Sequence, residues 1–154
     1  MLFRHNRPEY SDGVIDLIPM HIGMPNRELG FGHEQVWKIT LHNERQEIGQ
    51  ISYRDGESRC MYYFGHIGYH INPPWRGNHF ARRACSLLRQ TVFLSGKTSV
   101  VITCDPDNTP SRITCEHLGC IPEGIVAVPE DLQQKYDLNH TKCRYIWHVV
   151  SEQE

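Results

Sequence analysis

Residues 67–81 read IGYHINPPWRGNHFA. The apolar start predicts a strand, Pro73 and Pro74 end it, and an apolar stripe at helical spacing predicts a helix from about Gly77 to Leu94. The N-terminus of such a helix offers unpaired backbone N–H groups and the positive end of the helix dipole, which together bind phosphate. The stretch contains neither GxxxxGK(S/T) nor GxGxxG, so it is not a Walker loop and does not support a dinucleotide-binding Rossmann motif.

The distribution of charge also predicts an anionic partner at this place. Residues 75–97 carry five basic and no acidic side chains, which leaves 11 basic and 18 acidic residues in the rest of the chain. Nucleic acid requires a broader basic face with aromatic side chains, so we expect a small phosphate-bearing ligand and no nucleic acid. A solvated helix face is the alternative explanation.

Length and composition indicate one soluble domain over residues 1–154. The content of 39% hydrophobic and 22% charged residues is typical of a globular chain. No apolar run approaches the roughly 20 residues that span a bilayer, and residues 1–8 contain no apolar segment typical of a secretory signal. The six cysteines form no CxxC pair, so we expect free thiols in a reducing cytoplasm, without a membrane partner.

Metal binding is the weakest of the candidate functions. The ten histidines include no HExxH pattern. His66, His70 and His79 form the closest cluster. We predict no metal, and metal analysis after mild chelation would test that expectation.

The rest of the chain predicts a mixed α/β fold with part of the sheet parallel. Pro19–Glu34 reads as a long loop. The other expected helices are Thr109–Leu118 and Pro129–Tyr136. Composition and alternation predict strands at Val36–His42, Glu47–Arg54, Cys60–Ile71, Ser99–Cys104, Cys120–Val128 and Cys143–Val150. Of these, Ser99–Cys104 is expected to be buried on both faces.

Two motifs carry a resemblance to a known family. Arg76–Ala81 resembles motif A, Q/R-x-x-G-x-G/A, of the GNAT N-acetyltransferase superfamily, with His79 in place of the central glycine. Residues 105–120 read DPDNTPSRITCEHLGC and are similar to motif B of the same superfamily. In motif B the matching positions are Asn108, Ser111, Glu116, Leu118 and Gly119, whereas Cys115 and Cys120 replace aromatic residues. This Asn–Ser form is similar to the branch that acetylates the N-termini of ribosomal proteins.

The resemblance implies a fold, a cofactor and an activity. The fold is a mixed, mostly antiparallel twisted sheet with helices on both faces and a central splayed strand pair, and the cofactor core covers about residues 60–120. Acetyl-CoA is the implied co-substrate and a primary amine of a small molecule or a peptide or protein N-terminus is the acceptor. A homodimer is compatible with the resemblance. The alternative is a non-catalytic acyl-CoA-binding or regulatory module. The implied cofactor-binding residues are Tyr69, Ile71, Arg76, Gly77, Asn78, His79, Phe80, Ala81, Asn108 and Ser111.

The resemblance implies direct attack of the amine on the thioester, and candidates for each step follow. Cys115 or Ser111 is the expected proton donor to the departing thiolate. The proton acceptor stays open among His70, His66 and a water chain to Asp105 or Glu34. Backbone N–H groups near Tyr69 to Ile71 are expected to bind the acetyl carbonyl if this strand splays from its neighbour. The acceptor pocket is placed in the loop from His21 to Glu34.

Overall fold

The chain is built on a five-stranded antiparallel sheet. The computed structural model describes residues 7–23 and 25–149. The strands are in chain order across the sheet, with β1 (Tyr10–Ser11), β2 (Ile15–Gly23), β3 (Glu34–Leu41), β4 (Glu47–Arg54) and β5 (Ile67–Ile71). In β3, Trp37 and Ile39 are buried because alternate side chains face the core, as the sequence pattern predicts.

A smaller antiparallel sheet follows in the second half of the chain. Its strand order is β6-β8-β7, with β6 (Ser99–Cys104), β7 (Ile121–Ala127) and β8 (Thr141–His148). The prediction that β6 is buried on both faces is wrong, because Val100, Ile102 and Cys104 are buried while the alternate side chains are half-buried. All ladders between the described strands are antiparallel, so the expected parallel part of the sheet is not present as a ladder.

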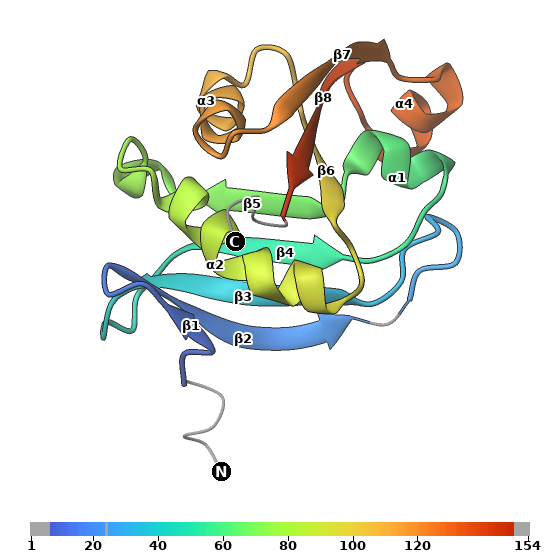
Figure 1. Ribbon diagram of the computed structural model, residues 1–154. Helices are drawn as coiled ribbons and strands as arrows, with labels where there is room; N and C mark the ends of the chain where they lie inside the picture. The colour runs from blue at the N-terminus through green and yellow to red at the C-terminus, as the bar shows by residue number, and fades with distance from the viewer. Residues whose placement is uncertain (1–6, 24, 150–154) are drawn as a thin grey trace.

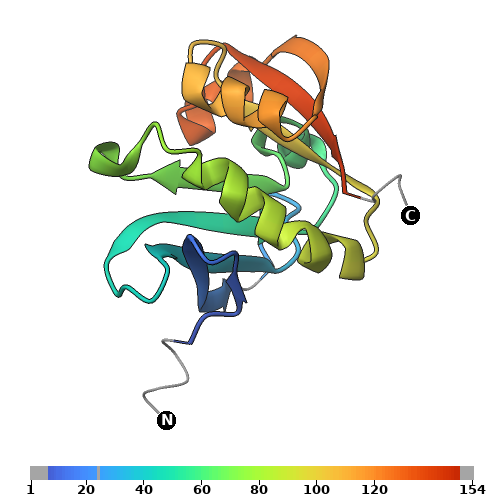
Figure 2. The ribbon, with the colours of Figure 1, turned by 60° about the vertical axis from the view of Figure 1, so that its left-hand side comes forward.

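Two helices complete the main core. Helix α2 (Phe80–Leu94) crosses one face of the five-stranded sheet, and α3 (Thr109–His117) lies beside it (Figures 1 and 2). The buried stripe of α2 is Ala81, Ala84, Cys85, Leu88 and Val92, at the spacing that the sequence predicts. None of the helices in the described ranges is long and apolar enough to cross a membrane.

The segment predicted as one long strand, Cys60–Ile71, is instead a helix followed by a strand. Helix α1 (Arg59–Phe64) begins after Ser58, whose side chain accepts a hydrogen bond from the Met61 amide, and it ends at Gly65 with φ of 78°. A capping serine and a terminating glycine outweigh the strand-like composition of the segment. With α4 (Glu130–Tyr136), α1 forms a second small apolar cluster around Cys60, Val128 and Leu132.

The loop predicted at Pro19–Glu34 is also shorter than expected. Strand β2 continues to Gly23 through a register shift between Pro19 and His21. The proline is tolerated within the strand because it lies next to a bulge, one of the positions where prolines occur in strands. The connection to β3 begins only after Gly23, and Met24 lies outside the described residues.

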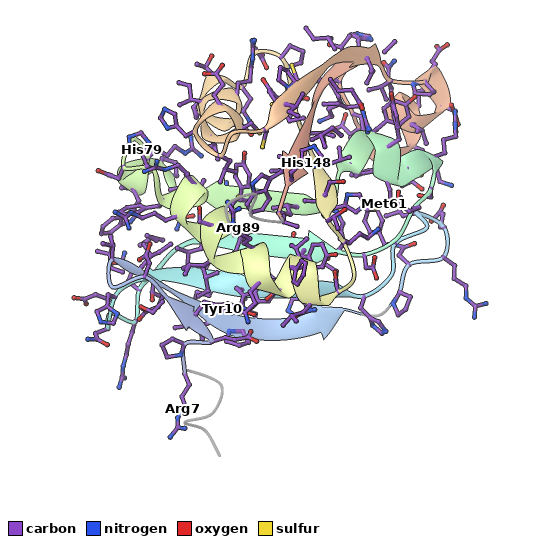
Figure 3. The ribbon with its side chains drawn as sticks, in the orientation of Figure 1. Arg7, Tyr10, Met61, His79, Arg89 and His148 are labelled. Atoms are coloured by element: carbon purple, nitrogen blue, oxygen red, sulfur yellow. The ribbon has the colours of Figure 1, made fainter. Side chains whose placement is uncertain are left out.

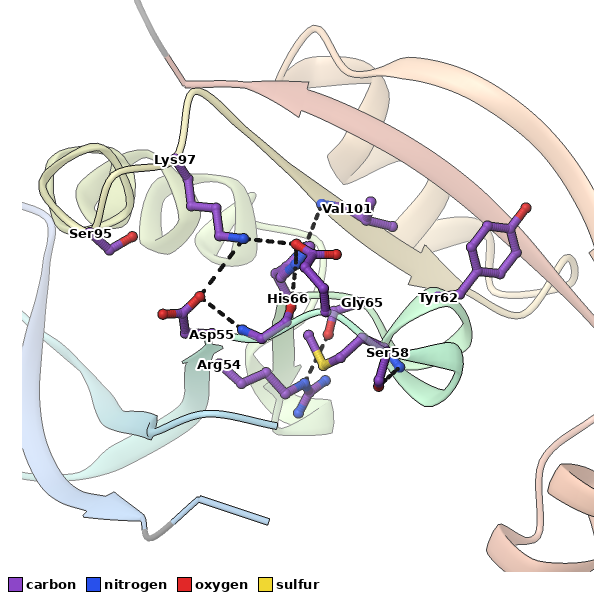
Figure 4. A network of polar contacts seen from close by, with 12 residues as sticks. Arg54, Asp55, Ser58, Tyr62, Gly65, His66, Ser95, Lys97 and Val101 are labelled. Carbon is purple, nitrogen blue, oxygen red and sulfur yellow. Dashed lines mark hydrogen bonds and ion pairs between the residues drawn. The ribbon is translucent and has the colours of Figure 1, made fainter. Parts of the chain in front are cut away.

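Strands β5 and β6 separate from each other, which confirms the expected splayed pair. At the closed end, the His66 amide donates to the Val101 carbonyl at 2.8 Å and the Val101 amide donates to Nδ1 of the His66 ring at 3.0 Å (Figure 4). Beyond this clasp the two strands share no ladder among the described residues. Gly65 is needed beside it because an added Cβ would lie 3.0 Å from the Val101 carbonyl oxygen.

Candidate active site

The turn before α2 presents backbone amides rather than side chains. Gly77 has φ of 87° and His79 has φ of 62°, so two left-handed residues reverse the chain between Arg76 and the helix. No side chain among the described residues caps α2 at His79. The N–H groups of its first turn, from Phe80 to Arg82, therefore remain available to an anion.

A cavity of about 410 Å³ lies against this turn. It extends between β5 and α3, and its walls include most of the residues that motif A and motif B identify: Tyr69, Ile71, Arg76, Gly77, His79, Phe80, Ala81, Asn108 and Ser111. Asn78 does not line it, because its side chain donates to the Trp75 carbonyl at 3.1 Å and stabilises the turn from behind. We call this space the cofactor cavity.

The backbone of β5 supplies donors along one edge of the cofactor cavity. The Arg54 amide donates to the His66 carbonyl and the Asn72 amide donates to the Ile48 carbonyl. The even-numbered residues of this segment therefore form the hydrogen-bonded pairs with β4. Because bonded pairs alternate in an antiparallel ladder, Tyr69 and Ile71 turn their N–H groups toward the open edge. The splay therefore leaves these two amides without a strand partner.

Arg76 connects the turn to this same edge. Its Nε donates to the Ile71 carbonyl oxygen at 2.8 Å. The carbonyl of Ile71 is thereby occupied by the protein, whereas its amide is not. Arg76 itself is exposed, and it lines the cofactor cavity together with the first residues of α2.

Three residues separate the cofactor cavity from a second cavity. Tyr69, Asn108 and Ser111 line both spaces. The Tyr69 hydroxyl and the Ser111 hydroxyl are 2.7 Å apart, and the Ser111 amide donates to Oδ1 of Asn108 at 3.2 Å, so Asn108 caps α3 and positions Ser111. Burial raises the pKa of Tyr69, which keeps its phenol protonated at neutral pH.

The second cavity measures about 220 Å³ and is more polar. Asp105 lies in its wall and pairs with Lys142 at 2.8 Å, and Arg54 in the same wall pairs with Glu34 at 2.9 Å. Asp105 is about one-third exposed, so its carboxylate can meet a cationic group that enters. We call this space the acceptor cavity.

The predicted proton donors differ in their access to these cavities. Ser111 is on the wall of both cavities, whereas Cys115 is completely buried behind it and lines neither. The adjacent Cys120 thiol and burial raise the pKa of Cys115, so it remains a thiol. Burial likewise raises the pKa of Cys104, on the acceptor side, to about 11.

The two candidate histidines are not brought together. His70 is exposed and lines the cofactor cavity, away from the acceptor cavity. His66 is 5% exposed and its ring is bonded between Val101, Gly56 and Glu57, so it touches neither cavity. Burial lowers the pKa of His66 and keeps the ring neutral. Its role in the structure is to hold β5 against β6.

Two contacts of the site, and the residue Lys142, could not be found from the sequence. The hydroxyl of Tyr69 lies 42 positions from Ser111, and Lys142 reaches Asp105 from β8. Neither contact has a local sequence signal, because strand order decides both. The loop predicted to hold the acceptor, His21 to Glu34, contributes no described residue to either cavity.

No group of three His, Cys, Asp or Glu side chains that could hold a metal ion occurs within residues 7–23 and 25–149. The six cysteines are all buried and unbridged.

This geometry agrees with a family assignment made from the sequence. The sequence model of the acetyltransferase (GNAT) domain family matches residues 13–121, which include both motifs that form the cavities. The chain belongs to the GNAT acetyltransferase family. No curated protein matches the sequence.

Solved structures of acetyltransferases share the fold. The microcin C7 self-immunity acetyltransferase MccE, in complex with acetyl-CoA and AMP, is 22% identical over 75% of this chain and 61% of its own, with a TM-score of 0.57. The ribosomal-protein-S5-alanine acetyltransferase from Vibrio fischeri is 20% identical over 79% of this chain and 64% of its own, with a TM-score of 0.58.

A third acetyltransferase structure is similar to the chain to the same degree. The acetyl transferase from Salmonella typhimurium that modifies the N-terminal serine of ribosomal protein L7/L12 is 20% identical over 80% of this chain and 67% of its own, with a TM-score of 0.58. At this identity the likeness shows the fold. The chain spans less than two thirds of the length of the first two proteins.

Proposed function

We propose that this GNAT protein transfers the acetyl group of acetyl-CoA to a primary amine by direct attack. The observation that carries the proposal is the meeting of two cavities at Tyr69, Asn108 and Ser111. One cavity offers amides and an arginine to a diphosphate and a pantetheine arm, and the other offers a carboxylate to an ammonium. The presence of acetyl-CoA in the MccE structure supports this choice of cofactor.

The cofactor is proposed to bind with its diphosphate on the first turn of α2. The helix N-terminus and Arg76 supply positive charge there. The pantetheine arm follows the open edge of β5, where the N–H groups of Tyr69 and Ile71 are available. An amide on this edge then donates to the acetyl carbonyl, whose oxygen gains negative charge during the attack.

The acceptor amine is proposed to enter through the acceptor cavity. Its ammonium pairs with Asp105 and loses a proton to that carboxylate, directly or through water. The free amine attacks the acetyl carbon and the C–S bond breaks. Ser111 gives its proton to the departing thiolate of CoA and takes up the second proton of the attacking nitrogen, directly or through water, so that the products are the neutral amide and the CoA thiol. Tyr69, 2.7 Å from the Ser111 oxygen, holds that hydroxyl in place with its own O–H.

Thiol release with a panel of amines tests the proposal. Acetyl-CoA and either small primary amines or peptides with free N-termini are supplied, and free CoA thiol is measured. Release that depends on the amine, with a product heavier by one acetyl group, is expected. A non-catalytic acyl-CoA-binding module binds the cofactor and releases none.

Two matched pairs of variants assign the roles. Ser111→Ala is expected to lower kcat at least tenfold with unchanged affinity for CoA, whereas Cys115→Ser changes kcat little because its side chain lines neither cavity. Asp105→Asn is expected to raise KM for the amine, and Asp107→Asn in the same loop serves as its control. Equal kinetics of Asp105→Asn and Asp107→Asn would remove the carboxylate from the mechanism.

A further inference from the structure

The acceptor cavity contains an ion pair whose two partners both line it. Because Cys104 of β6 lies opposite Cys143 of β8, the next residues along the two strands also face each other. These residues are Asp105 and Lys142, with Nζ of the lysine 2.8 Å from Oδ1 of the aspartate. Lys142 is near the start of β8, at the end of the strand away from His148, which Figure 3 labels. The pairing of β6 with β8 therefore places an ammonium and a carboxylate side by side in the wall.

Both ions keep hydrogen-bonding capacity that the protein does not use. A lysine ammonium has three N–H donors and a carboxylate has two oxygens. Within residues 7–23 and 25–149, Lys142 donates one hydrogen bond, to Oδ1 of Asp105, and Oδ2 of Asp105 accepts none. The side chain of Lys142 is only 15% exposed. A charge that is this far removed from water favours a ligand group of opposite charge over a neutral one.

The wall of the acceptor cavity carries no net charge. Besides Asp105 and Lys142, the charged residue among those that line it is Arg54. The Arg54 guanidinium pairs with Glu34 at 2.9 Å, and its Nε donates to the Gly65 carbonyl at 2.9 Å. A neutral wall matches a ligand that is itself neutral overall. It does not match a polyamine or an aminoglycoside, because several ammonium groups would need an excess of carboxylates.

The acceptor cavity is also small. Its volume of about 220 Å³ is below the roughly 300–1,000 Å³ of pockets that bury drug-sized ligands. Ser111 lies where this cavity meets the cofactor cavity, so the reacting amine belongs at that end. Tyr63, Phe64 and Ile67 add apolar surface to the wall. A molecule with one amine, one carboxylate and an uncharged side chain fits this size and this distribution of charge.

We propose that the acceptor is an α-amino acid with an uncharged side chain, bound as a zwitterion with its ammonium on Asp105 and its carboxylate on Lys142. The proposal rests on the proposed acetyl transfer and names its acceptor. In an α-amino acid both charged groups are attached to one carbon, so they reach two side chains whose charged atoms are 2.8 Å apart. The N-terminal residue of a peptide has a neutral amide in place of the carboxylate, and it offers Lys142 no anion.

The transfer to an amino acid balances with these residues. The N–C bond of an N-acetylamino acid forms and the C–S bond of acetyl-CoA breaks. One proton of the ammonium leaves to water through Asp105, and a second reaches the CoA thiol through Ser111. Lys142 binds the carboxylate and takes no part in the proton transfers. Its loss is therefore expected to raise KM for the amino acid more than it lowers kcat.

The choice between an amino acid and its amide tests the proposal. Alanine, leucine, methionine and phenylalanine are each supplied with acetyl-CoA, and so is the amide of each, in which a neutral group replaces the carboxylate. For the best amino acid, kcat/KM is expected to be at least about tenfold higher than for its amide, the effect of one charge-assisted contact. The comparison is strict, because the amine of the amide loses its proton more readily and more of it is free to attack at neutral pH.

Variants at position 142 assign this preference to the lysine. Lys142→Met removes the charge from a side chain of similar shape, and it is expected to bring the two values of kcat/KM close to equality. Lys142→Arg keeps the charge and is expected to keep most of the preference. Lys135→Met removes the same charge from the exposed side of α4, outside the acceptor cavity, and it is expected to leave the ratio unchanged.

An amide that is acetylated as efficiently as its amino acid would overturn the proposal, as would a ratio unchanged in Lys142→Met. More efficient acetylation of spermidine, or of a peptide with an amidated C-terminus, would overturn it in favour of a polyamine or a protein N-terminus.

The failure of this proposal differs from the failure of the proposed function. Calorimetric titration of the complex with CoA measures binding of the amino acid and of its amide without turnover. A complex that prefers the amino acid and transfers no acetyl group keeps the amino acid site and loses the enzymatic proposal. Transfer to amines without this preference keeps the proposed function and loses the amino acid site.

Discussion

Replacing His79 tests whether the turn before α2 is held in a conformation that suits glycine better than any other residue. His79 has φ of 62° and ψ of 24°, in the left-handed region, where GNAT motif A has glycine. The side chain is exposed, and the centroid of its ring lies 5.2 Å from that of His117. His79→Gly removes the side chain and the backbone cost together, whereas His79→Ala removes the side chain alone.

The expected difference follows from the backbone. The left-handed conformation costs an L-residue about 1–2 kcal/mol. Glycine avoids this cost, but about 0.5–1 kcal/mol of the gain is offset because an unfolded chain with glycine has more conformational freedom. The free energy of unfolding is therefore expected to be about 1 kcal/mol higher for His79→Gly than for His79→Ala. In a domain of this size, that difference corresponds to about 2–4 °C in Tm.

Thermal unfolding of both variants and the wild type, followed by circular dichroism, measures this difference. The expected order of Tm is the glycine variant, the wild type and then the alanine variant. Urea unfolding with equal m-values confirms that the change lies in stability and not in the denatured state. An alanine variant as stable as the glycine variant would refute the assignment of a left-handed conformation to residue 79 in the turn before α2.

Three further predictions concern the strands and the cavity wall. Burial lowers the pKa of His66 in the folded protein, and protonation of Nδ1 would break the hydrogen bond that this atom accepts from the Val101 amide. As the pH falls, the histidine of the unfolded chain is therefore protonated before that of the folded protein, which favours unfolding. Below about pH 6.5 the wild type is then expected to lose more Tm than His66→Asn, and equal pH profiles would contradict it. A Cβ at Gly49 would lie 2.2 Å from the His70 carbonyl oxygen. Gly49→Ala is therefore expected to lower the free energy of unfolding by about 2 kcal/mol, measured by urea unfolding. Ala81→Leu places a larger side chain in the wall of the cofactor cavity and is expected to weaken CoA binding by calorimetry, and wild-type affinity would contradict the position of that wall.

Local sequence patterns were sufficient where neighbouring residues alone specify an element. The alternation of β4 gave its bounds, Glu47–Arg54, and the apolar spacing of α2 gave its buried face. Motif A identified the turn at Arg76–Ala81, because its glycine and its helix start are adjacent in the chain. The same approach missed α1, since the aromatic composition of Cys60–Phe64 favours a strand and only the Ser58 cap indicates a helix.

Contacts between distant segments were beyond these patterns. Periodicity reports which face of an element is buried and says nothing of which element covers it. The single cysteine that motif B suggested as a proton donor, Cys115, is therefore indistinguishable in sequence from one facing a cavity. Its complete burial follows from the packing of α3 against the core.

The sequence by itself determined the α/β class, the GNAT motifs and the helix that begins beside motif A, because each depends on residues within one or two turns of chain. The tertiary structure alone decided the rest of the site. The clasp between His66 and Val101 sets where β5 leaves β6, and that separation exposes the amides of Tyr69 and Ile71. The cavity lined by Arg82, Ser86 and His117 likewise exists only because folding places α3 beside α2.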